Sequence, residues 1–489
     1  MRRNSLLIIT CWLLSCTCFA QSAKPKLVVG LVIDQMRWDF LYRYSSLYSG
    51  NGFKRLLKEG FSAENTLIPY VPTYTAPGHT AIYTGSPPAI SGIPGNDWFD
   101  KSTGKDVYCT SDEQVEPVGG SNAKAGKMSP ANLWVTTVTD ELRLSNNFKS
   151  KVIGIALKDR GAILPAGHTA NAAYWYDNGA WITSSHYMKT LPEWVNQFNG
   201  KDVAGTAMRT DWHTLLPLEQ YDLSSADDQP YENTIKGETT VVFPHKLSSI
   251  AANDKYEAFR TTPFANSFTF AFAKAAIENE ALGQHSVPDF LTISMSSTDY
   301  IGHTFGPNSV EIEDTYLRLD KDIADFLSYL DTKIGKGTYT LFLTADHGVA
   351  HVPRFLSEHK ILGAIDQQNT LPDFAKELNE KIAKKFAITD AVSKVMNYQV
   401  YLDAENIAQN SGDINAIKQF LLTVLMARDD ISHAVELDKV QQAALPAPLK
   451  EMMINGYNPK RSGDIQVVYK PGYLANNGQK GTSHGLWNP

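Results

Sequence analysis

Residues 28–34 read VVGLVID, residues 290–299 read FLTISMSSTD, and residues 339–346 read YTLFLTAD. Each stretch is an apolar run that ends in an aspartate, and such runs are typical of parallel strands buried on both faces. Open α/β sheets bind their ligands outside the carboxyl ends of the strands. The three runs therefore predict an α/β fold with a mostly parallel central sheet flanked by helices, and a polar site at one end of its strands.

Histidines accompany two of the three terminal aspartates. Asp299 is followed by His303, Asp346 is followed directly by His347, and Asp34 ends the first run. A single aspartate after a strand is more often a turn residue or a helix cap than a ligand. Because the same placement occurs three times, the pattern favours a site for a divalent metal bound by carboxylate and imidazole groups.

Residues 1–20 have the features of a secretory signal peptide. Arg2 and Arg3 precede an apolar segment that is too short for a comfortable membrane span, and the small residue Ala20 ends it. The mature chain, residues 21–489, is therefore expected in the periplasm or secreted. A lipoprotein modified at Cys16 is the alternative, but the better-formed cleavage site follows Ala20.

The composition is that of an ordinary globular protein. Of all residues 43% are hydrophobic and 20% are charged, and the formal net charge is −7. An acidic chain argues against nucleic acid as the main partner, although local cations can still bind an anionic substrate. Cys109 is the single cysteine of the expected mature chain, so that chain can form no internal disulfide.

The remaining pattern predicts the elements around the strand ends. We expect strands over 26–34 and 151–157, a helix that begins near Pro77, a polar excursion over 110–128 and an amphipathic helix over 308–334. A further helix is expected after Ser129, which would cap it. Its predicted apolar face includes Trp134, Val138 and Leu142.

Two segments are expected outside the main sheet. Asn178 and Gly179 predict the turn of a β-hairpin over 173–187, which we expect to cap the site rather than to join the sheet. Residues 352–480 mix helical and strand patterns after the third aspartate run, and predict a smaller lobe inserted into one catalytic domain over 21–489.

Five polar residues outside the aspartate runs are candidates for a reaction. Thr75 stands at the predicted helix start, where free N–H groups favour an anion; its hydroxyl can attack an electrophile or merely cap the helix. Lys158 and Arg160 follow a predicted strand, and can converge on one oxyanion or form an exposed charged turn. Asn96 and His484 lie in glycine-containing segments, and each taken alone is an ordinary turn or loop residue.

Seven motifs, read in order along the mature chain, form a specific set: VIDQMRWD, PTYTAPGHTAIYTG, GNDWFD, LKDRGAILPAGH, SSTDYIGH, TADHG and GTSHG. With this set the chain resembles the PafA-type alkaline phosphatases of the alkaline phosphatase superfamily. The resemblance implies an alkaline-phosphatase-like fold and a hydrolase that acts on small-molecule phosphate monoesters. We also expect a monomer with no nucleic acid partner, given the acidic charge, and with no transmembrane segment, since no stretch beyond residues 1–20 is suited to cross a bilayer.

The resemblance implies two Zn²⁺ ions and a threonine nucleophile. Thr75 would take the phosphoryl group as phosphothreonine, and water would then release inorganic phosphate. Two metal ions suit this reaction because they stabilise both the attacking and the leaving oxygens. The non-bridging phosphoryl oxygens would contact Asn96, Lys158 and Arg160. The ligands would be Asp299, His303 and His484 for one zinc, and Asp34, Asp346, His347 and the Thr75 oxygen for the other.

Two alternatives differ in substrate or in catalytic competence. A nucleotide pyrophosphatase or phosphodiesterase of the same superfamily would share the metals and Thr75, but Lys158 and Arg160 favour a dianionic monoester over a diester. The sequence ends five residues after His484, whereas relatives continue further. We therefore expect a truncated sequence. If the protein does stop at Pro489, we expect His484 to be weakly held, which leaves a catalytically impaired metal-binding relative as the second alternative.

Overall fold

The computed structural model describes residues 24–361, 371–474, 480–485 and 487. The expected signal peptide and the alternative lipid site at Cys16 lie outside the described residues. None of the helices in the described part combines the length and the apolar character that a membrane span requires.

A seven-stranded sheet forms the centre of the larger part of the molecule, in the order β4-β7-β6-β5-β8-β1-β9. The five strands β6, β5, β8, β1 and β9 are parallel, and β7 and β4 add antiparallel pairs at one edge. The mostly parallel α/β sheet predicted from the apolar runs is therefore confirmed. The strands are β1 (Leu27–Ile33), β4 (Pro117–Val118), β5 (Val152–Ala156), β6 (Ala172–Asp177), β7 (Ala180–Ser184), β8 (Asp289–Met295) and β9 (Tyr339–Thr344).

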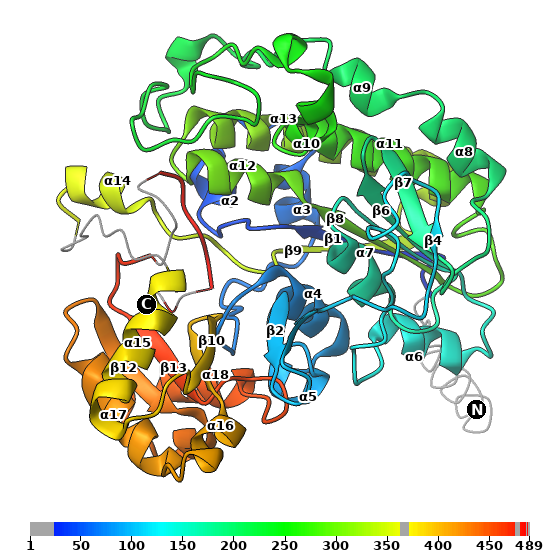
Figure 1. Cartoon of the computed structure of the whole chain (residues 1–489). Coiled ribbons are helices and arrows are strands. Elements are labelled where there is room, and N and C mark those ends of the chain that lie inside the picture. The colour runs from blue at the N-terminus through cyan, green and yellow to red at the C-terminus, as the bar shows by residue number, and fades with distance from the viewer. Residues whose placement is uncertain (1–23, 362–370, 475–479, 486, 488–489) are drawn as a thin grey trace, which may run out of the picture.

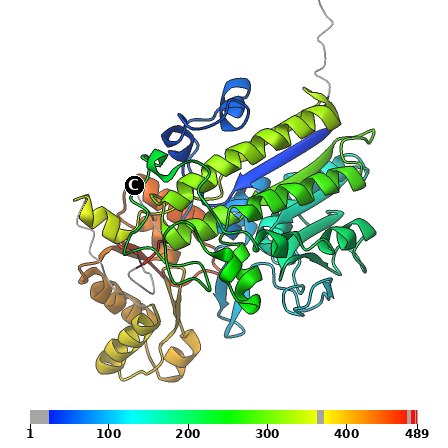
Figure 2. The same ribbon diagram turned by 90° about the horizontal axis from the view of Figure 1, so that it is seen from above.

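Helices cover both faces of this sheet, with α11, α12 and α13 on one face and α4, α6 and α7 on the other (Figure 1). Seen from above, α11 and α13 run side by side (Figure 2). The buried residues of these layers include Leu31, Ile293 and Phe326. The helices are α2 (Phe40–Arg43), α3 (Phe53–Glu59), α4 (Thr75–Thr84), α5 (Pro88–Ser91), α6 (Val138–Ser145), α7 (Asp159–Ala166), α8 (Glu193–Asn199), α9 (Val203–Ala207), α10 (Ala252–Phe259), α11 (Phe264–Asn279), α12 (Ser297–Phe305), α13 (Val310–Leu330) and α14 (Pro353–Glu358).

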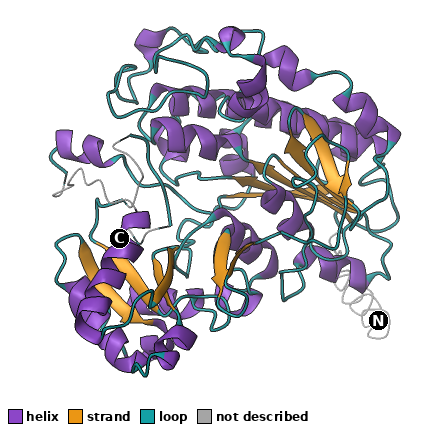
Figure 3. Cartoon of the chain, viewed as in Figure 1, coloured by secondary structure: helices purple, strands orange, loops and turns teal. Residues whose placement is uncertain are grey.

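A second, four-stranded antiparallel sheet lies apart from the first (Figure 3). Its strands run in the order β10-β11-β13-β12, and helices α15 and α17 pack on it. The sheet and helices enclose a separate hydrophobic core with Leu378, Val400, Leu421 and Ile465. Its elements are β10 (Val392–Met396), β11 (Gln399–Leu402), β12 (Ile431–Glu436), β13 (Ile465–Tyr469), α15 (Leu371–Phe386), α16 (Ala404–Gln409), α17 (Ile414–Met426) and α18 (Ala447–Gly456).

The hairpin around Asn178 and Gly179 exists, but its expected position was wrong. Strands β6 and β7 meet at this turn, and β6 pairs in parallel with β5, so the hairpin belongs to the main sheet. All six residues of β6 are buried. The sequence pattern identifies the turn, whereas the pairing partner is set by packing against distant residues. The polar stretch over 110–128 supplies the short edge strand β4.

The prediction of a helix that begins directly after Ser129 was also wrong. The helix α6 begins only at Val138, where Thr137 forms a capping box with Asp140. Trp134 is not helical and is 46% exposed, and its indole instead stacks on the guanidinium of Arg461 at 4.2 Å. Apolar spacing suggested a helical face, but tertiary contacts and the stronger cap at Thr137 determine the actual start.

Candidate active site

The three aspartates of the apolar runs meet at the carboxyl ends of adjacent strands. Asp34 directly follows β1, Asp346 follows β9 after one intervening residue, and Asp299 lies in the first turn of α12 beyond β8. Since β8, β1 and β9 are neighbours and parallel, the three carboxylates converge. All three are buried, with at most 4% of each residue exposed.

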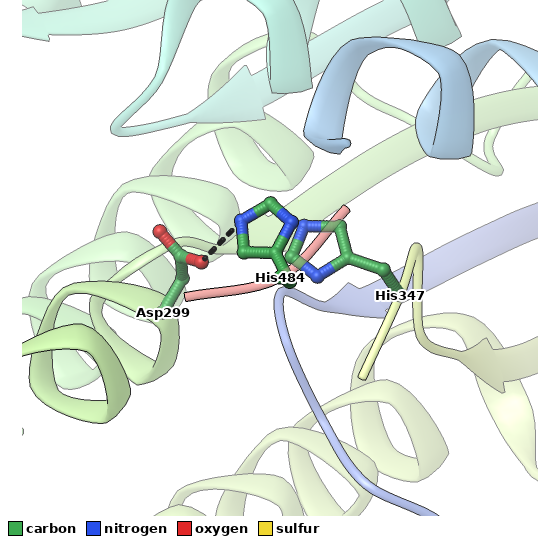
Figure 4. A group of neighbouring side chains, drawn as sticks. All are labelled: Asp299, His347 and His484. Atoms are coloured by element: carbon green, nitrogen blue, oxygen red, sulfur yellow. Dashed lines mark ion pairs between the residues drawn. The ribbon is translucent and has the colours of Figure 1, made fainter. Parts of the chain in front are cut away.

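Two compact groups of ligand atoms form here. Asp34, Asp346 and His347 make one group, and Asp299, His347 and His484 make the other; within each group the atoms lie within 4.8 Å of one another. Figure 4 shows the second group, in which the His347 and His484 rings stack with centroids 3.6 Å apart. His303 completes the surroundings of Asp299, since its Nε2 lies 3.2 Å from the Asp299 Oδ1.

The three imidazoles are oriented in the same way. The Nδ1 atoms of His347, His303 and His484 lie 2.9, 2.8 and 2.8 Å from the backbone carbonyls of residues 348, 482 and 73. A carbonyl can only accept, so each Nδ1 donates its hydrogen there. Each Nε2 then keeps a lone pair directed at the carboxylates, as in histidines that bind metal.

The carboxylates have free acceptor capacity at the same point. Asp34 Oδ1 and Asp346 Oδ2 are buried without a hydrogen-bond partner, and both face the His347 Nε2, at 3.5 and 3.3 Å. Burial and the nearby charge of Asp346 raise the pKa of Asp34 well above its usual value. Burial and the neighbouring imidazoles lower the pKa of His484, which favours its neutral form. These donors fit a divalent metal with nitrogen and oxygen ligands.

Thr75 points into this group rather than capping its helix. It is the first residue of α4, and Tyr74 occupies the cap position without a side-chain hydrogen bond. The Thr75 Oγ1 lies 3.4 Å from the His347 Nε2 and 3.5 Å from the Lys158 Nζ. The hydroxyl is therefore next to both a ligand imidazole and a cation.

Lys158 and Arg160 are not an exposed turn, because α7 directs both inward from its N-terminus. The Lys158 Nζ donates to Asp34 Oδ2 at 2.7 Å and to Asp299 Oδ2 at 2.5 Å, so it links the two ligand groups. Burial opposes a charged lysine, but the charges of Asp299 and Asp34 raise the Lys158 pKa above its usual value.

Arg160 is held separately from Lys158, by a chain of hydrogen bonds. Its Nη1 donates to the Tyr108 hydroxyl at 3.0 Å, and that hydroxyl donates to Asp159 Oδ1 at 2.7 Å. Asn96 is held by the start of α4, where its Oδ1 accepts the Ala76 N–H at 2.9 Å. This contact leaves the Asn96 Nδ2 as the donor available to an anion.

Two residues that sequence reasoning did not single out complete the arrangement. Gln35 donates its backbone N–H to Asp346 and its side-chain amide to Asp299, at 3.1 and 2.7 Å. The His79 Nδ1 lies 2.9 Å from the Thr75 carbonyl and 3.3 Å from the Asp346 Oδ2. The sequence offers only one indication of their roles, which is their position: Gln35 directly follows Asp34, and His79 lies one helical turn after Thr75.

The segment around His484 is firmly connected to the rest of the site, contrary to our expectation. The backbone N–H of Gly481 donates to Tyr231, and that of Thr482 donates to His303. The Thr482 hydroxyl donates to the Ala350 carbonyl at 2.7 Å. These bonds attach the segment next to His484 to three different parts of the chain.

Comparisons with known proteins agree with this geometry. The model of the type I phosphodiesterase / nucleotide pyrophosphatase family matches residues 28–487. Alkaline phosphatase PafA of Elizabethkingia meningoseptica is 49% identical, over 95% of this chain and 85% of its own length. Alkaline phosphatase PhoV of Synechococcus elongatus is 52% identical, over 96% and 84%. A Myroides odoratus protein named calcium-transporting ATPase is 54% identical, over 95% and 85%.

The crystal structure of wild-type alkaline phosphatase PafA matches with a TM-score of 0.92 and 49% identity, covering 95% of this chain and 89% of that one. The sheet and its ligand groups define a metal-binding hydrolase of the α/β class. The chain belongs to the type I phosphodiesterase / nucleotide pyrophosphatase family and, within it, to the PafA-type alkaline phosphatases.

Proposed function

We propose that the protein hydrolyses phosphate monoesters to an alcohol and inorganic phosphate, with Thr75 as the nucleophile. The observation that carries the proposal is the position of the Thr75 hydroxyl, within 3.5 Å of both a ligand imidazole and the Lys158 ammonium. Two bound zinc ions would supply charge stabilisation to the attacking and leaving oxygens. Asp34, Asp346 and His347 would hold one ion, and Asp299, His303 and His484 the other.

The chain's own residues account for the other requirements of phosphoryl transfer, which are mainly positioning and charge. Thr75 lies at the N-terminus of α4, where the helix dipole favours the phosphoryl oxygens. Asn96 Nδ2 and the Arg160 guanidinium would donate to the non-bridging oxygens, and Lys158 adds a second positive charge. A dianionic monoester gains more from these cations than a diester does, because a diester has one charge fewer.

The spacing of these four residues gives independent support. A crystal structure of an alkaline phosphatase PafA mutant, 48% identical to this chain, carries substitutions at a threonine, an asparagine, a lysine and an arginine. Those four positions are separated by 21, 62 and 2 residues, the same separations as between Thr75, Asn96, Lys158 and Arg160. This agreement supports Thr75, Asn96, Lys158 and Arg160 as the counterparts of those four residues.

We also propose that the mature protein is exported and acts as a monomer in the periplasm or outside the cell. Support comes from the sequence of residues 1–20, with Arg2 and Arg3 before an apolar segment that ends at Ala20. Residues 352–480 are proposed as a lobe of the same catalytic domain. The support is a hydrogen bond from the Asn397 side-chain amide, in the turn between β10 and β11, to the Asp97 carbonyl at 2.6 Å. This bond joins the second sheet to the hairpin of β2 (Asp97–Asp100) and β3 (Lys105–Tyr108).

The decisive experiment compares a phosphate monoester with a diester on purified wild type, Thr75→Ala and Thr84→Ala, together with zinc analysis. We expect a monoester preference in wild type, and a loss of kcat/KM of at least about 10²-fold in Thr75→Ala with zinc retained. Thr84 lies on the same helix with its hydroxyl bonded to the Thr80 carbonyl, so Thr84→Ala should keep its activity.

Two outcomes would contradict the proposal. A preference for the diester would support the nucleotide pyrophosphatase or phosphodiesterase alternative. Zinc binding without turnover in the wild type, unchanged by Thr75→Ala, would support an impaired metal-binding relative.

A further inference from the structure

The second sheet reaches the candidate active site through one hairpin turn. Strands β10 and β11 are joined by two residues, Asn397 and Tyr398. In Figure 1, β10 lies beside β2, the strand that begins directly after Asn96. The turn is separated from Asp97 by 300 positions in the chain, yet the fold places it next to a residue that we propose as a donor to the phosphoryl group.

The Asn397 side chain contacts both neighbours of Asn96. Its Nδ2 donates to the Asp97 carbonyl at 2.6 Å. On the other side, a Cβ at Gly95 would lie 2.5 Å from the same Nδ2, so the amide takes the space that any larger residue at position 95 would need. Gly95 is buried, and its lack of a side chain permits this close approach. The amide therefore packs across residues 95–97, with Asn96 at their centre.

Asn96 needs such contacts because it lies outside any helix or strand, in the loop between α5 and β2. Its Oδ1 accepts the Ala76 N–H at 2.9 Å, and its backbone carbonyl accepts the Cys109 N–H at 2.8 Å. These two bonds hold the side chain and one peptide group. The Asn397 amide adds a bond to the next peptide group, at Asp97, and so holds the backbone on the far side of Asn96 as well.

The turn itself is held in a conformation that few residues adopt. Asn397 and Tyr398 have φ values of 54° and 60°, and the common two-residue hairpin turns need positive φ at both positions. Asparagine tolerates this conformation, whereas glycine rather than tyrosine is the usual second residue. Tyr398 is 5% exposed, and its hydroxyl donates to the His484 carbonyl at 3.4 Å. Because such a conformation persists only where the surroundings determine it, the turn presents Asn397 in a fixed position.

We propose that Asn397 is a positioning residue for the phosphoryl site: its amide holds residues 95–97 so that the Asn96 Nδ2 is directed at a non-bridging phosphoryl oxygen. This role rests on the proposed function, because it takes Asn96 as a donor to the phosphoryl group. It also gives the lobe over 352–480 a part in substrate binding, although Asn397 itself touches neither the substrate nor a metal ligand.

The test is a double-mutant cycle of wild type, Asn397→Gly, Asn96→Ala and the double variant, all as zinc-loaded full chains. Calorimetry measures the affinity for inorganic phosphate, and kcat/KM is measured for a monoester. Glycine keeps the positive φ and removes only the amide. We expect Asn397→Gly to lower both values by about 10-fold, since misplacing a binding group by about 1 Å can cost up to about 100-fold. The zinc content should equal that of wild type.

The cycle separates positioning from a general effect on the fold. If Asn397 acts through Asn96, then Asn397→Gly should change phosphate affinity by less than about 2-fold once Asn96→Ala is present, because residues that act as a unit are not additive. Asn178→Gly is the matched control. Asn178 is also the first residue of a two-residue hairpin turn with positive φ, 46°, but it is exposed, between β6 and β7. It should keep the phosphate affinity of wild type.

Two results would overturn the proposal. Equal losses of phosphate affinity in the wild-type and Asn96→Ala backgrounds would mean that Asn397 acts on the fold as a whole. Unchanged affinity in Asn397→Gly would mean that residues 95–97 keep their position without the amide. Should Asn397→Gly not fold, Asn397→Ser, which also removes the amide, takes its place in the cycle.

The calorimetric cycle needs no turnover, so its outcome is distinct from that of the proposed function. Phosphate binding without monoester hydrolysis in wild type would refute the proposed function alone, and the cycle would still decide the role of Asn397. A wild type that binds no phosphate would refute both.

Discussion

Gln35 connects the two ligand groups of the candidate active site through a single residue. Its backbone N–H orients Asp346 while its side-chain amide orients Asp299. The backbone is in the left-handed region, with φ 69°, which is uncommon outside glycine. Gly302 leaves room for the side chain, since a Cβ there would lie 1.9 Å from the Gln35 Oε1. The unfavourable backbone conformation of Gln35 is therefore explained by its function, because it lets one residue position two carboxylates.

We predict that Gln35→Ala weakens zinc binding by about 10–100-fold, because outer hydrogen bonds to metal ligands have effects of this size. The kcat/KM for a monoester should fall with it. Competition with a chromogenic chelator measures the affinity. Gln35→Gly is the matched control: it loses the same amide but tolerates the positive φ, so it should unfold at a higher temperature than Gln35→Ala with equally weak zinc binding. Wild-type zinc affinity in both variants would contradict this role.

At the scale of elements, β5 and α7 form the unit that delivers Lys158 and Arg160. The helix packs closely on the strand at Gly154, where a Cβ would lie 2.2 Å from the Ala162 carbonyl and 3.0 Å from the Ala166 Cβ. Both neighbours belong to α7, and the carbonyl is backbone that cannot rotate away. The position of the two cations thus depends on a strand residue with no side chain.

Gly154→Ala should push α7 away from β5, and we expect it to lower the free energy of unfolding by about 1–3 kcal/mol, the usual cost of overpacking a core. Monoester hydrolysis should also fall, since the cations move with the helix. Urea unfolding and kcat/KM measure the two effects. Gly50→Ala is the control, because a Cβ there has nothing within 4 Å. Equal stability of the two variants would show that β5 and α7 accommodate the methyl group.

Local patterns predicted the elements of the sheet well. The apolar run before Asp34 gave β1 within a residue, because buried parallel strands need continuous apolar side chains on both faces. The helix α4 begins at Thr75, two residues before the predicted Pro77. The failures involve long-range packing: Trp134 lies against Arg461, and a Cβ at Gly92 would lie 2.5 Å from the Trp134 ring. No short stretch of sequence around Trp134 contains Arg461 or Gly92.

At the scale of the whole molecule, the candidate ligands could be found from the sequence, but their supports could not. Asp34 and Asp299 carry a visible signal because each ends an apolar run. Gln35 carries none, since its bond to Asp299 spans 264 positions. His484 was expected to be weakly held if the protein stops at Pro489, because it lies five residues before that position. In the structure its ring is oriented by residues brought close by folding, such as Thr73, whose carbonyl lies 2.8 Å from the His484 Nδ1.

A buried histidine away from the candidate active site predicts how the stability of the whole fold changes with pH. The His245 Nδ1 lies 2.9 Å from Glu238 Oε2, and its Nε2 lies 3.2 Å from Glu311 Oε1. Burial opposes a charged imidazole, but hydrogen bonds to the two glutamates raise the pKa of His245 to about 9 in the folded protein, against an ordinary value of 6.5, so the folded state keeps a proton that the unfolded chain releases. Its stabilising effect is complete below pH 6.5 and is lost as the pH rises through 9. Each extra proton held changes the unfolding free energy by about 1.4 kcal/mol per pH unit. Glu232, whose pKa is raised to about 10 by burial and by the charge of Glu311, acts in the same direction.

We therefore expect the free energy of unfolding to fall as the pH rises from 6.5 to 9, and His245→Gln to reduce the slope, because its side chain cannot take up the proton. Urea unfolding at a series of pH values, with zinc at saturation, measures the slope. His213→Gln changes an exposed histidine and should leave the slope unchanged. If His245→Gln and His213→Gln have the same slope as wild type, then His245 does not hold the extra proton, and the ion pairs with Glu238 and Glu311 contribute little to folding.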